Sequence, residues 1–251
     1  MSSSSKEVTL GISTTLERVA NVYVFPSSHE VCLLVSIQGG TPESLPPQFL
    51  EVHCNGSGVG DSRNTVIDNV STDYLAFCDD DVVPNYGEIL NAVDRMRRSS
   101  YDFFLGRIHD FEGNPRKGYC KSGKEVNYWN IGKVGTPEIL INVESLRRCN
   151  VRFDSRFGAG SSNPVGDEMI FLADCLKAGL KGQHTSNVFG YHNAISSGVS
   201  NQVRLLPNRI KAGRRAFQGA RLPFFVLFVV KTTVKFLFAS LSNFTRSHSH
   251  R

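Results

Sequence analysis

The sequence predicts an α/β fold in which a mostly parallel β-sheet carries helices on both faces. Runs typical of β-strands alternate with helical patterns along residues 1–195, which indicates successive β-α-β units. The run Val31–Ile37 is continuous and apolar, as in a strand buried on both faces. The 251 residues, of which 40% are hydrophobic and 20% charged, are enough to form one large domain or two small ones.

Seven strands are expected from short runs of aliphatic, β-branched and aromatic residues bounded by turn residues. In order, they cover Val8–Ser13, Val31–Ile37, Glu51–Cys54, Tyr74–Cys78, Asp102–Ile108, Glu138–Asn142 and Val188–His192. The loop at residues 110–135, rich in Gly, Lys and Asn, is long enough to carry function. Within it, Trp129 is expected either to stack on a ligand ring or to pack in the core, and Lys117, Lys121 and Lys124 are typical of a solvated face.

The helices between the strands are expected from capping residues and from apolar positions that repeat every three to four residues. Thr14 with Glu17 forms a capping-box pattern for the first helix, and Asp61 or Ser62 can cap the second. Gly179 is expected at the C-terminal end of the last helix. A shorter helical turn is expected at Val143–Arg148. The apolar faces of the four expected helices are, in chain order, Leu16, Val19, Ala20 and Tyr23; Val66, Ile67 and Val70; Ile89, Leu90, Val93 and Met96; and Met169, Leu172, Ala173 and Leu176.

Charge is distributed unevenly along the chain. Residues 1–174 carry a net charge of −7, whereas residues 175–251 contain 12 Lys and Arg and no Asp or Glu. This asymmetry predicts a polyanionic partner, such as nucleic acid, a membrane surface or a phosphate-bearing substrate. The apolar run Leu222–Leu241 is broken by Lys231 and Lys235, and such a block favours an anionic membrane surface over nucleic acid.

The C-terminal segment is expected to lie on a membrane without crossing it. Its uninterrupted apolar part, Leu222–Val230, is shorter than the about 20 residues that a bilayer requires. Packing of this segment on the domain or on a partner subunit is the alternative. The residues expected at headgroups are Arg204, Arg209, Lys211, Arg214, Arg215 and Arg221, and those expected in the acyl boundary are Phe224, Phe225, Leu227, Phe228, Phe236, Leu237 and Phe238.

The six cysteines are spread along the chain without a Cys-x-x-Cys pair. This pattern argues against a clustered zinc site and a disulfide scaffold, and it favours reduced thiols. The N-terminus has no apolar stretch, so no signal peptide is expected. Together with the basic C-terminal segment, these features predict a cytoplasmic protein held peripherally at the inner face of the cell membrane.

Three consecutive acids, Asp79, Asp80 and Asp81, follow the strand expected at Tyr74–Cys78. Open α/β sheets bind ligands beyond the carboxyl ends of their strands, so a site is expected here. In an extended segment Asp79 and Asp81 point to one side and Asp80 to the other. A divalent cation, Mg²⁺ or Mn²⁺, would relieve the repulsion between the two same-side carboxylates. A simple acidic turn that caps the helix after Pro84 is the alternative.

The order and spacing of three segments resemble the GT-A glycosyltransferases of family 2. The segments read GVGDSRNTVIDNVSTDYLAFCDDDVVP, FDSRFGAGSSNPVGDEMIFLADCLKAGLK and VFGYHNAISSG, and the resemblance covers about residues 8–198. It implies a Rossmann-like GT-A fold and a metal-dependent, inverting transfer of a sugar from a nucleotide diphosphate to a hydroxyl.

The resemblance also implies roles for individual residues. Asp79 and Asp81 match the Asp-x-Asp motif that binds ribose and metal, with Asp80 beside the nucleotide, and Arg63 matches the arginine of the nucleotide-side helix. His192 matches a late histidine that contacts metal or diphosphate, although a histidine at a strand end is as often structural.

The catalytic base is expected at the start of the helix that Gly166 opens. Glu168 or Asp167 matches the family's base, which takes the proton of the acceptor hydroxyl. The two residues are adjacent and diverge by about 100° on a helix, so only one can face the sugar. Glu168 is favoured by register and reach, and a purely structural role of both at a helix N-terminus is the alternative.

Two segments depart from the family pattern. Ser36-Ile37-Gln38-Gly39-Gly40 stands where the second strand usually ends in Asp-Asp, so Gln38 is expected to read the base of the nucleotide, with a UDP-sugar the expected donor. Ser13-Thr14-Thr15 replaces the Pro-x-x-Asn after the first strand, which weakens the nucleotide contact implied there and leaves Ser13 as the expected contact residue.

The sequence as a whole predicts a glycosyltransferase of cell-surface polysaccharide synthesis that acts on a glycan or lipid-linked acceptor. A catalytic domain is expected at 1–198, with a nucleotide half at 1–108 and an acceptor half at 109–198, followed by the membrane-associating segment at 199–251. A nucleotidyltransferase is the second hypothesis, although no Gly-rich, basic loop stands at residues 11–21. A non-catalytic, membrane-associated protein that binds nucleotides or carbohydrates is the third.

Overall fold

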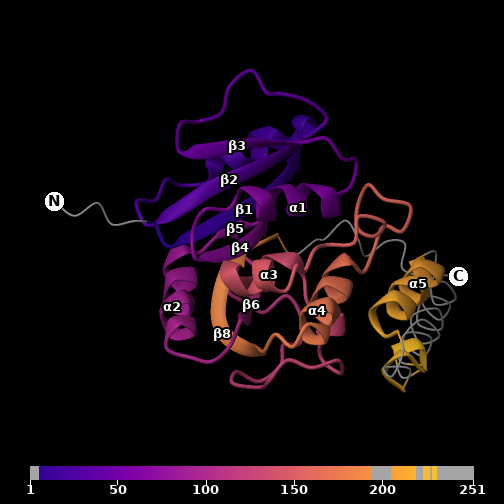
Figure 1. The fold of residues 1–251 in the computed structure, drawn as a ribbon. Coiled ribbons are helices and arrows are strands. Elements are labelled where there is room, and N and C mark those ends of the chain that lie inside the picture. Colours follow the sequence, from indigo (N-terminus) through magenta and orange to yellow (C-terminus); the bar gives the residue numbers. More distant parts are fainter. Residues whose placement is uncertain (1–5, 194–204, 219–222, 227, 231–251) are drawn as a thin grey trace, which may run out of the picture.

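A computed structural model describes residues 6–193, 205–218, 223–226 and 228–230 (Figure 1). The strands are β1 (Val8–Thr15), β2 (Val31–Gln38), β3 (Phe49–Cys54), β4 (Tyr74–Asp79), β5 (Val83–Pro84), β6 (Phe103–His109), β7 (Ile139–Asn142) and β8 (Gly182–Tyr191). The α-helices are α1 (Val59–Asn69), α2 (Tyr86–Arg97), α3 (Val143–Arg148), α4 (Asp167–Lys177) and α5 (Leu206–Ala216). The 3₁₀-helices are η1 (Leu16–Val24), η2 (Ile131–Lys133) and η3 (Thr136–Glu138).

The strands form one sheet in the order β3-β2-β1-β4-β7-β6-β8-β5. Strands β1, β2, β3 and β4 pair in parallel, as do β6 and β8, while β7 and β5 run antiparallel to their neighbours. The expected mostly parallel sheet is therefore confirmed. Because the chain crosses from one side of β1 to the other, the carboxyl ends of β1, β2 and β4 meet at a point where such sheets bind ligands.

The core lies on both faces of the sheet, which explains why the strands are continuous apolar runs. On β4, Leu75 and Phe77 pack on one face with α1, α3 and α4, whereas Ala76 and Cys78 pack on the other with η1 and α2. Figure 1 shows α3 and α4 in front of the sheet and α2 beside β8. The helices hold the strands so that the polar residues at the strand ends project from a rigid edge.

The first helix differs from the sequence expectation, and the capping box of Thr14 is wrong. Thr14 belongs to β1, and the helix after it begins at Leu16 without a side-chain cap. The helix is 3₁₀, with three residues per turn, so Val19 and Val22 are buried while Ala20 is exposed.

Other expected boundaries also shift. Helix α1 begins at Val59, so Asp61 and Ser62 lie within its first turn and do not cap it. The last strand starts at Gly182, earlier than expected, because its first residues pair with β6. The short β5 was not expected: its pairing with β8 depends on tertiary contact and leaves no local pattern.

Helix α5 packs on the start of α4, as Figure 1 shows. The contact is close at Gly166, where an added Cβ would lie 2.5 Å from the Cβ of Ala212. Gly166 also has a φ of +92°, a conformation that favours glycine. Both the close contact and the backbone conformation therefore restrict this position to glycine. The start of the expected C-terminal segment is thus joined to the domain.

Three phenylalanines expected in a membrane, Phe224, Phe225 and Phe228, are partly buried against the domain core. This packing is the alternative that the sequence left open for these side chains. No helix within the described ranges is long and apolar enough to cross a membrane. The other expected membrane residues Leu227, Phe236, Leu237 and Phe238, and the basic residues Arg204, Arg221, Lys231 and Lys235, lie outside the described residues.

Candidate active site

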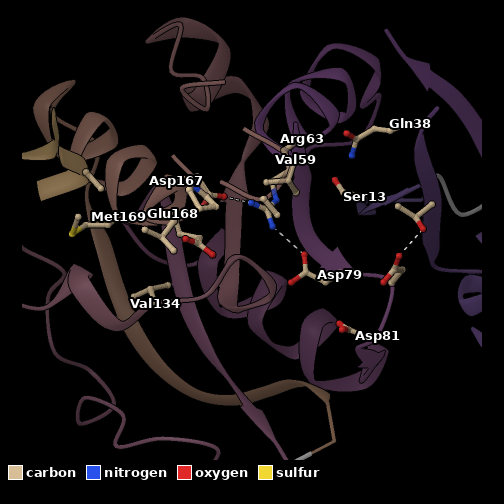
Figure 2. A pocket seen from close by; sticks show the side chains of 18 of the residues that line it. Ser13, Gln38, Val59, Arg63, Asp79, Asp81, Val134, Asp167, Glu168 and Met169 are labelled. Carbon is tan, nitrogen blue, oxygen red and sulfur yellow. Dashed lines mark hydrogen bonds and ion pairs between the residues drawn. The ribbon is translucent and has the colours of Figure 1, made fainter. Parts of the chain in front are cut away.

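A cavity of about 640 Å³ opens at the carboxyl ends of β1, β2 and β4 and at the start of α4 (Figure 2). The two halves of the expected domain both contribute to its wall. The sequence-predicted residues that line it are Ser13, Gln38, Arg63, Asp79, Asp80, Asp81, Asp167 and Glu168. The fold thus brings together residues that are up to 155 positions apart in the sequence.

Arg63 forms the centre of the site. It projects from α1, is buried, and donates through Nη2 to Asp79 Oδ1 at 3.0 Å and through Nη1 to Asp167 (Figure 2). Its guanidinium carbon also lies 5.4 Å from the ring centre of Phe153. Burial alone would lower the pKa of Arg63, but the carboxylates of Asp167 and Asp79 more than offset this effect and raise it. The site therefore contains a permanent positive charge between two carboxylates.

The three aspartates at the end of β4, of which Asp79 is the last residue of the strand, diverge in three directions. Asp79 turns toward Arg63, while Asp80 is buried on the opposite side and accepts a hydrogen bond from Thr14 Oγ1 at 2.6 Å. Asp81 is exposed and lies 3.3 Å, Oδ2 to Nε2, from His192. Asp79 and Asp80 therefore point to opposite sides, as expected, but the expectation that Asp81 shares the side of Asp79 is wrong: Asp79 pairs with Arg63, whereas Asp81 pairs with the same arginine as Asp80, Arg18.

Arg18 is a site residue that the sequence analysis missed. It forms ion pairs with both Asp80 and Asp81, the latter at 3.4 Å. The expectation of an α-helix obscured it, because its position at the mouth of the site depends on the 3₁₀ geometry of η1. Burial raises the pKa of Asp80, against the opposing effects of Thr14 and Arg18. Arg18 supplies the positive charge that neighbouring aspartates require.

Of the three residues expected to bind a divalent cation, Asp81 and His192 lie close together. Two neighbouring ligands of one ion, each about 2.1 Å from it, lie about 3 Å apart. The distance between Asp81 Oδ2 and His192 Nε2 is similar, at 3.3 Å. Asp79, expected as a third ligand, instead has Oδ1 engaged by Arg63. No group of three His, Cys, Asp or Glu residues suited to a metal occurs among the described residues. Asp81 offers one oxygen ligand of the kind that Mg²⁺ and Mn²⁺ prefer and His192 one nitrogen ligand, so these two residues by themselves are an incomplete set.

The adjacent carboxylates Asp167 and Glu168 stand in different surroundings at the start of α4. Asp167 is buried and paired with Arg63, whereas Glu168 is only partly buried and faces the cavity. Burial raises the pKa of Glu168 to about 8, and the charge of Asp167 adds to this effect while Arg63 opposes it. Of the two, Glu168 is the one with a carboxylate available to a ligand and with a strong affinity for a proton.

Ser13 and Gln38 lie at the ends of β1 and β2, on the far side of Arg63 from Glu168 (Figure 2). The Ser13 hydroxyl is buried and has no hydrogen-bond partner within the part of the chain that the structure describes. A buried unpaired hydroxyl costs about 1–3 kcal/mol, so its position beside the cavity points to a ligand. Gln38 also lines the cavity, as expected.

Several lining residues were not expected from sequence. Ala159 and Gly160 come from the loop before α4, Lys133 and Val134 from η2 and the residue after it, and Phe228 from the C-terminal segment. The glycine-rich run around residues 158–160 is the one signal that marks such a loop.

The sheet order, the ligand edge and the acidic segment after β4 define the class of protein as an α/β protein of the GT-A fold. This fold was the expectation from sequence, and it is confirmed. The chain shares it with S. aureus TarS: the crystal structure of its fragment 1–349 in complex with UDP-GlcNAc has a TM-score of 0.64, 12% identity, and coverage of 89% of this chain and 71% of that one. The same fragment in complex with UDP gives a TM-score of 0.62 at 13% identity, over 90% of this chain and 71% of that chain.

Within this class, the chain is similar to glycosyltransferases of family 2. Residues 43–146 match the family described as Glycosyl transferase family 2, a stretch that contains Arg63 and the three aspartates but ends before Glu168. The chain is also 28% identical over 103 residues to the succinoglycan biosynthesis protein ExoM of Rhizobium meliloti (strain 1021). That alignment covers 40% of this chain and 33% of ExoM.

Proposed function

We propose that the protein is an inverting, metal-dependent glycosyltransferase that moves a sugar from a nucleoside-diphosphate sugar to a hydroxyl of a glycan or lipid-linked acceptor. The observation that carries the proposal is the position of Arg63, which joins the aspartate segment after β4 to the start of α4. The sheet edge that we assign to the nucleotide and Glu168, the proposed proton acceptor, line one cavity of about 640 Å³. A volume of this size is within the range of small-molecule sites.

The nucleotide lies over the ends of β1, β2 and β4. The unpaired Ser13 hydroxyl and the Gln38 amide supply uncharged hydrogen-bonding groups there, and Asp79 supplies an acceptor for ribose hydroxyls. Complexes of the structural neighbour TarS with UDP and UDP-GlcNAc support a uridine nucleotide as the donor's carrier. Gln38 reads its base.

Asp81 and His192 would hold a divalent cation, Mn²⁺ or Mg²⁺. Such an ion would neutralise charge that develops on the departing diphosphate. Arg18, which pairs with Asp81, remains close enough to share that carboxylate.

Glu168 acts as the general base. Its carboxylate takes the proton of the acceptor hydroxyl while the oxygen forms a bond to the anomeric carbon. The bond from that carbon to the diphosphate breaks on the opposite face, and the nucleoside diphosphate leaves with the electron pair. Asp167 holds Arg63 and does not take the proton.

The cellular context follows from the relatives and from the basic C-terminal segment. The name of ExoM, a succinoglycan biosynthesis protein, supports a role in polysaccharide synthesis. Residues 1–198 carry the proposed catalytic residues, α5 and the packed phenylalanines complete the core, and the exposed basic residues of the segment 199–251 meet the inner face of the cell membrane. Of the basic residues expected at headgroups, Lys211 and Arg214 are exposed on α5, whereas Arg215 turns inward to Asp154 and Asp174.

A thermal-shift panel of nucleotides tests donor binding. UDP with Mn²⁺ is expected to raise the Tm of the full-length protein, since a ligand at 100 times its Kd stabilises it by about 2.7 kcal/mol. Asp81→Asn and His192→Gln should abolish the Mn²⁺-dependent part of the shift. Asp68→Asn, an exposed carboxylate on α1, is the matched control and should leave it unchanged. The absence of any shift with UDP, ADP or GDP in the presence of Mn²⁺ would overturn the proposal.

A further inference from the structure

A second cavity, of about 490 Å³, adjoins the first. The two cavities share Gly132, Lys133, Val134, Arg209 and Phe228 as walls. Figure 2 draws Val134 and Glu168 on the wall of the first cavity. A molecule in the second cavity that extends past Val134 therefore enters the cavity that Glu168 lines. The function proposed above leaves this cavity without an occupant.

One wall of the second cavity is aromatic. Trp129 is 56% exposed, and its ring centre lies 4.3 Å from that of Phe224. Tyr128 and Phe217 stand behind Phe224 at 5.3 and 6.5 Å between ring centres. An aromatic side chain that is exposed at the mouth of a cavity offers a flat apolar face to a ring with an apolar face and polar edges, as a sugar has.

The charge in the cavity is positive. The one carboxylate on its wall, Glu138, is buried and already paired: Lys117 Nζ lies 2.6 Å from its Oε1, and Tyr119 donates to the same oxygen at 3.2 Å. Lys124 and Lys133 line the cavity and form no ion pair with any described residue. Two lysines are thus available to an anionic group of a ligand.

A buried histidine supplies an unsatisfied polar atom. His184 lines the cavity, is 7% exposed, and its Nε2 has no hydrogen-bond partner among the described residues. Burial, with a smaller contribution from Lys124, lowers the pKa of His184 to about 4, so the ring is neutral at physiological pH. A neutral imidazole exchanges a hydrogen bond with a hydroxyl and does not compete with the lysines for the anion.

We propose that the second cavity is the acceptor subsite and that it selects a sugar bearing an anionic group. The sugar ring lies against Trp129, its anionic group meets Lys124 and Lys133, and a ring hydroxyl pairs with His184. The hydroxyl that reacts extends past Val134 to Glu168. The inference rests on the proposed function, because the first cavity must hold the donor for the second to hold the acceptor.

The shared chemistry is a sugar with a negative charge, which a uronate or a sugar phosphate can supply. Trp129 is the only tryptophan in the protein, so its fluorescence reports directly on occupancy of this cavity. The full-length protein is titrated with methyl glucuronide, glucose 1-phosphate, neutral methyl glucoside and decyl phosphate. The glucuronide and the glucose phosphate distinguish the two sources of charge, and decyl phosphate tests whether an alkyl chain replaces the sugar.

At least one anionic sugar is expected to give a saturable change in Trp129 fluorescence at about tenfold lower concentration than methyl glucoside. Raising the salt concentration should weaken binding of the anionic sugar and leave binding of the neutral sugar unchanged. Lys124→Gln should remove most of the preference for the anionic sugar. Lys121→Gln, an exposed lysine in the same loop but outside the cavity wall, is the matched control and should retain it.

Equal affinity for charged and neutral sugars would overturn the proposal, as would equal binding of decyl phosphate or the absence of any saturable response. Loss of the preference in Lys121→Gln as well as Lys124→Gln would assign the effect to overall charge and also overturn it. The UDP thermal shift of the same preparations reports on the first cavity alone. A protein that binds an anionic sugar but no nucleotide would refute the glycosyltransferase and leave the sugar site standing.

Discussion

Arg63 and Asp167 form an ion pair in which each side chain is only 6% exposed. The pair joins α1, which lies at the nucleotide edge of the sheet, to α4, which carries Glu168. A buried pair of this kind adds little net stability, but loss of one partner leaves an uncompensated charge that costs about 3–5 kcal/mol. We therefore treat this contact as the one that fixes the geometry of the site.

The first prediction concerns Arg63 itself. Arg63→Met should lower the free energy of unfolding by about 3–5 kcal/mol in urea titrations, because Asp79 and Asp167 are left facing each other without a cation. The control is Arg152→Met, which removes an exposed pair with Asp68 that is worth about 0–1 kcal/mol. Equal losses in the two variants would contradict the assignment of a buried, structure-determining pair.

The second prediction separates the two carboxylates of α4. Asp167→Asn should destabilise the protein by about 3 kcal/mol, since it removes one of the two carboxylates that pair with a buried guanidinium. Glu168→Gln should instead raise the stability at pH 7, because this carboxyl is ionised in the unfolded chain and the folded protein must either protonate it or bury its charge. The UDP-dependent thermal shift should persist in Glu168→Gln. A loss of stability in Glu168→Gln but not in Asp167→Asn would exchange the roles that we assign to the two residues.

The third prediction concerns pH. Burial and the neighbouring Asp167 raise the pKa of Glu168 to about 8, above its value in the unfolded chain. A carboxyl with a raised folded pKa stabilises the fold while protonated, and this contribution is lost as the pH rises through the folded pKa. The Tm of the wild type should therefore fall relative to that of Glu168→Gln between pH 5 and about pH 9. Parallel Tm curves for the two proteins would contradict the raised pKa.

The fourth prediction concerns the membrane. The full-length protein should float with vesicles of phosphatidylcholine and phosphatidylglycerol at low salt, and Lys211→Glu with Arg214→Glu should reduce the floating fraction. The control is Lys6→Glu with Arg98→Glu, which changes the net charge equally; Arg98 follows α2, on the opposite side of the ribbon from α5 in Figure 1. Equal flotation of the two double variants would contradict a membrane-facing α5.

Point variants are preferable here to truncation. Removal of residues after 200 would take away Ala212, Ala216 and Phe217, which are buried in the domain core. A truncated chain would therefore expose apolar surface and aggregate for reasons unrelated to membranes. Removal of Phe224, Phe225 and Phe228, which pack against the core, would expose further apolar surface.

Much of the fold could be predicted from sequence because strands buried on both faces appear as continuous apolar runs. Val31–Ile37 is such a run, and β2 covers it. The aspartates after β4 were predictable for the same reason, since a buried strand that ends in acids marks the ligand edge. The capping box at Thr14 misled because its hydroxyl has a better acceptor in Asp80, far away in the sequence.

The rest of the site depends on contacts between distant residues. Arg63 and Asp167 are 104 positions apart, and no local sequence pattern predicts their contact. Arg18 reaches Asp80 and Asp81 from η1, and these ion pairs join residues more than 60 positions apart. The aromatic wall of the second cavity joins Trp129 to Phe224, which sequence reasoning placed in a lipid surface.

The most direct test of the central claim is the release of UDP from a panel of UDP-sugars, measured with Mn²⁺ and with a mixture of anionic and neutral sugar acceptors. The wild type should release UDP and form a glycoside with inverted anomeric configuration by NMR. Glu168→Gln should bind UDP normally and release it at least about 100-fold more slowly, the usual contribution of a general base. Undiminished UDP release by Glu168→Gln, or release of pyrophosphate instead of UDP, would contradict the account.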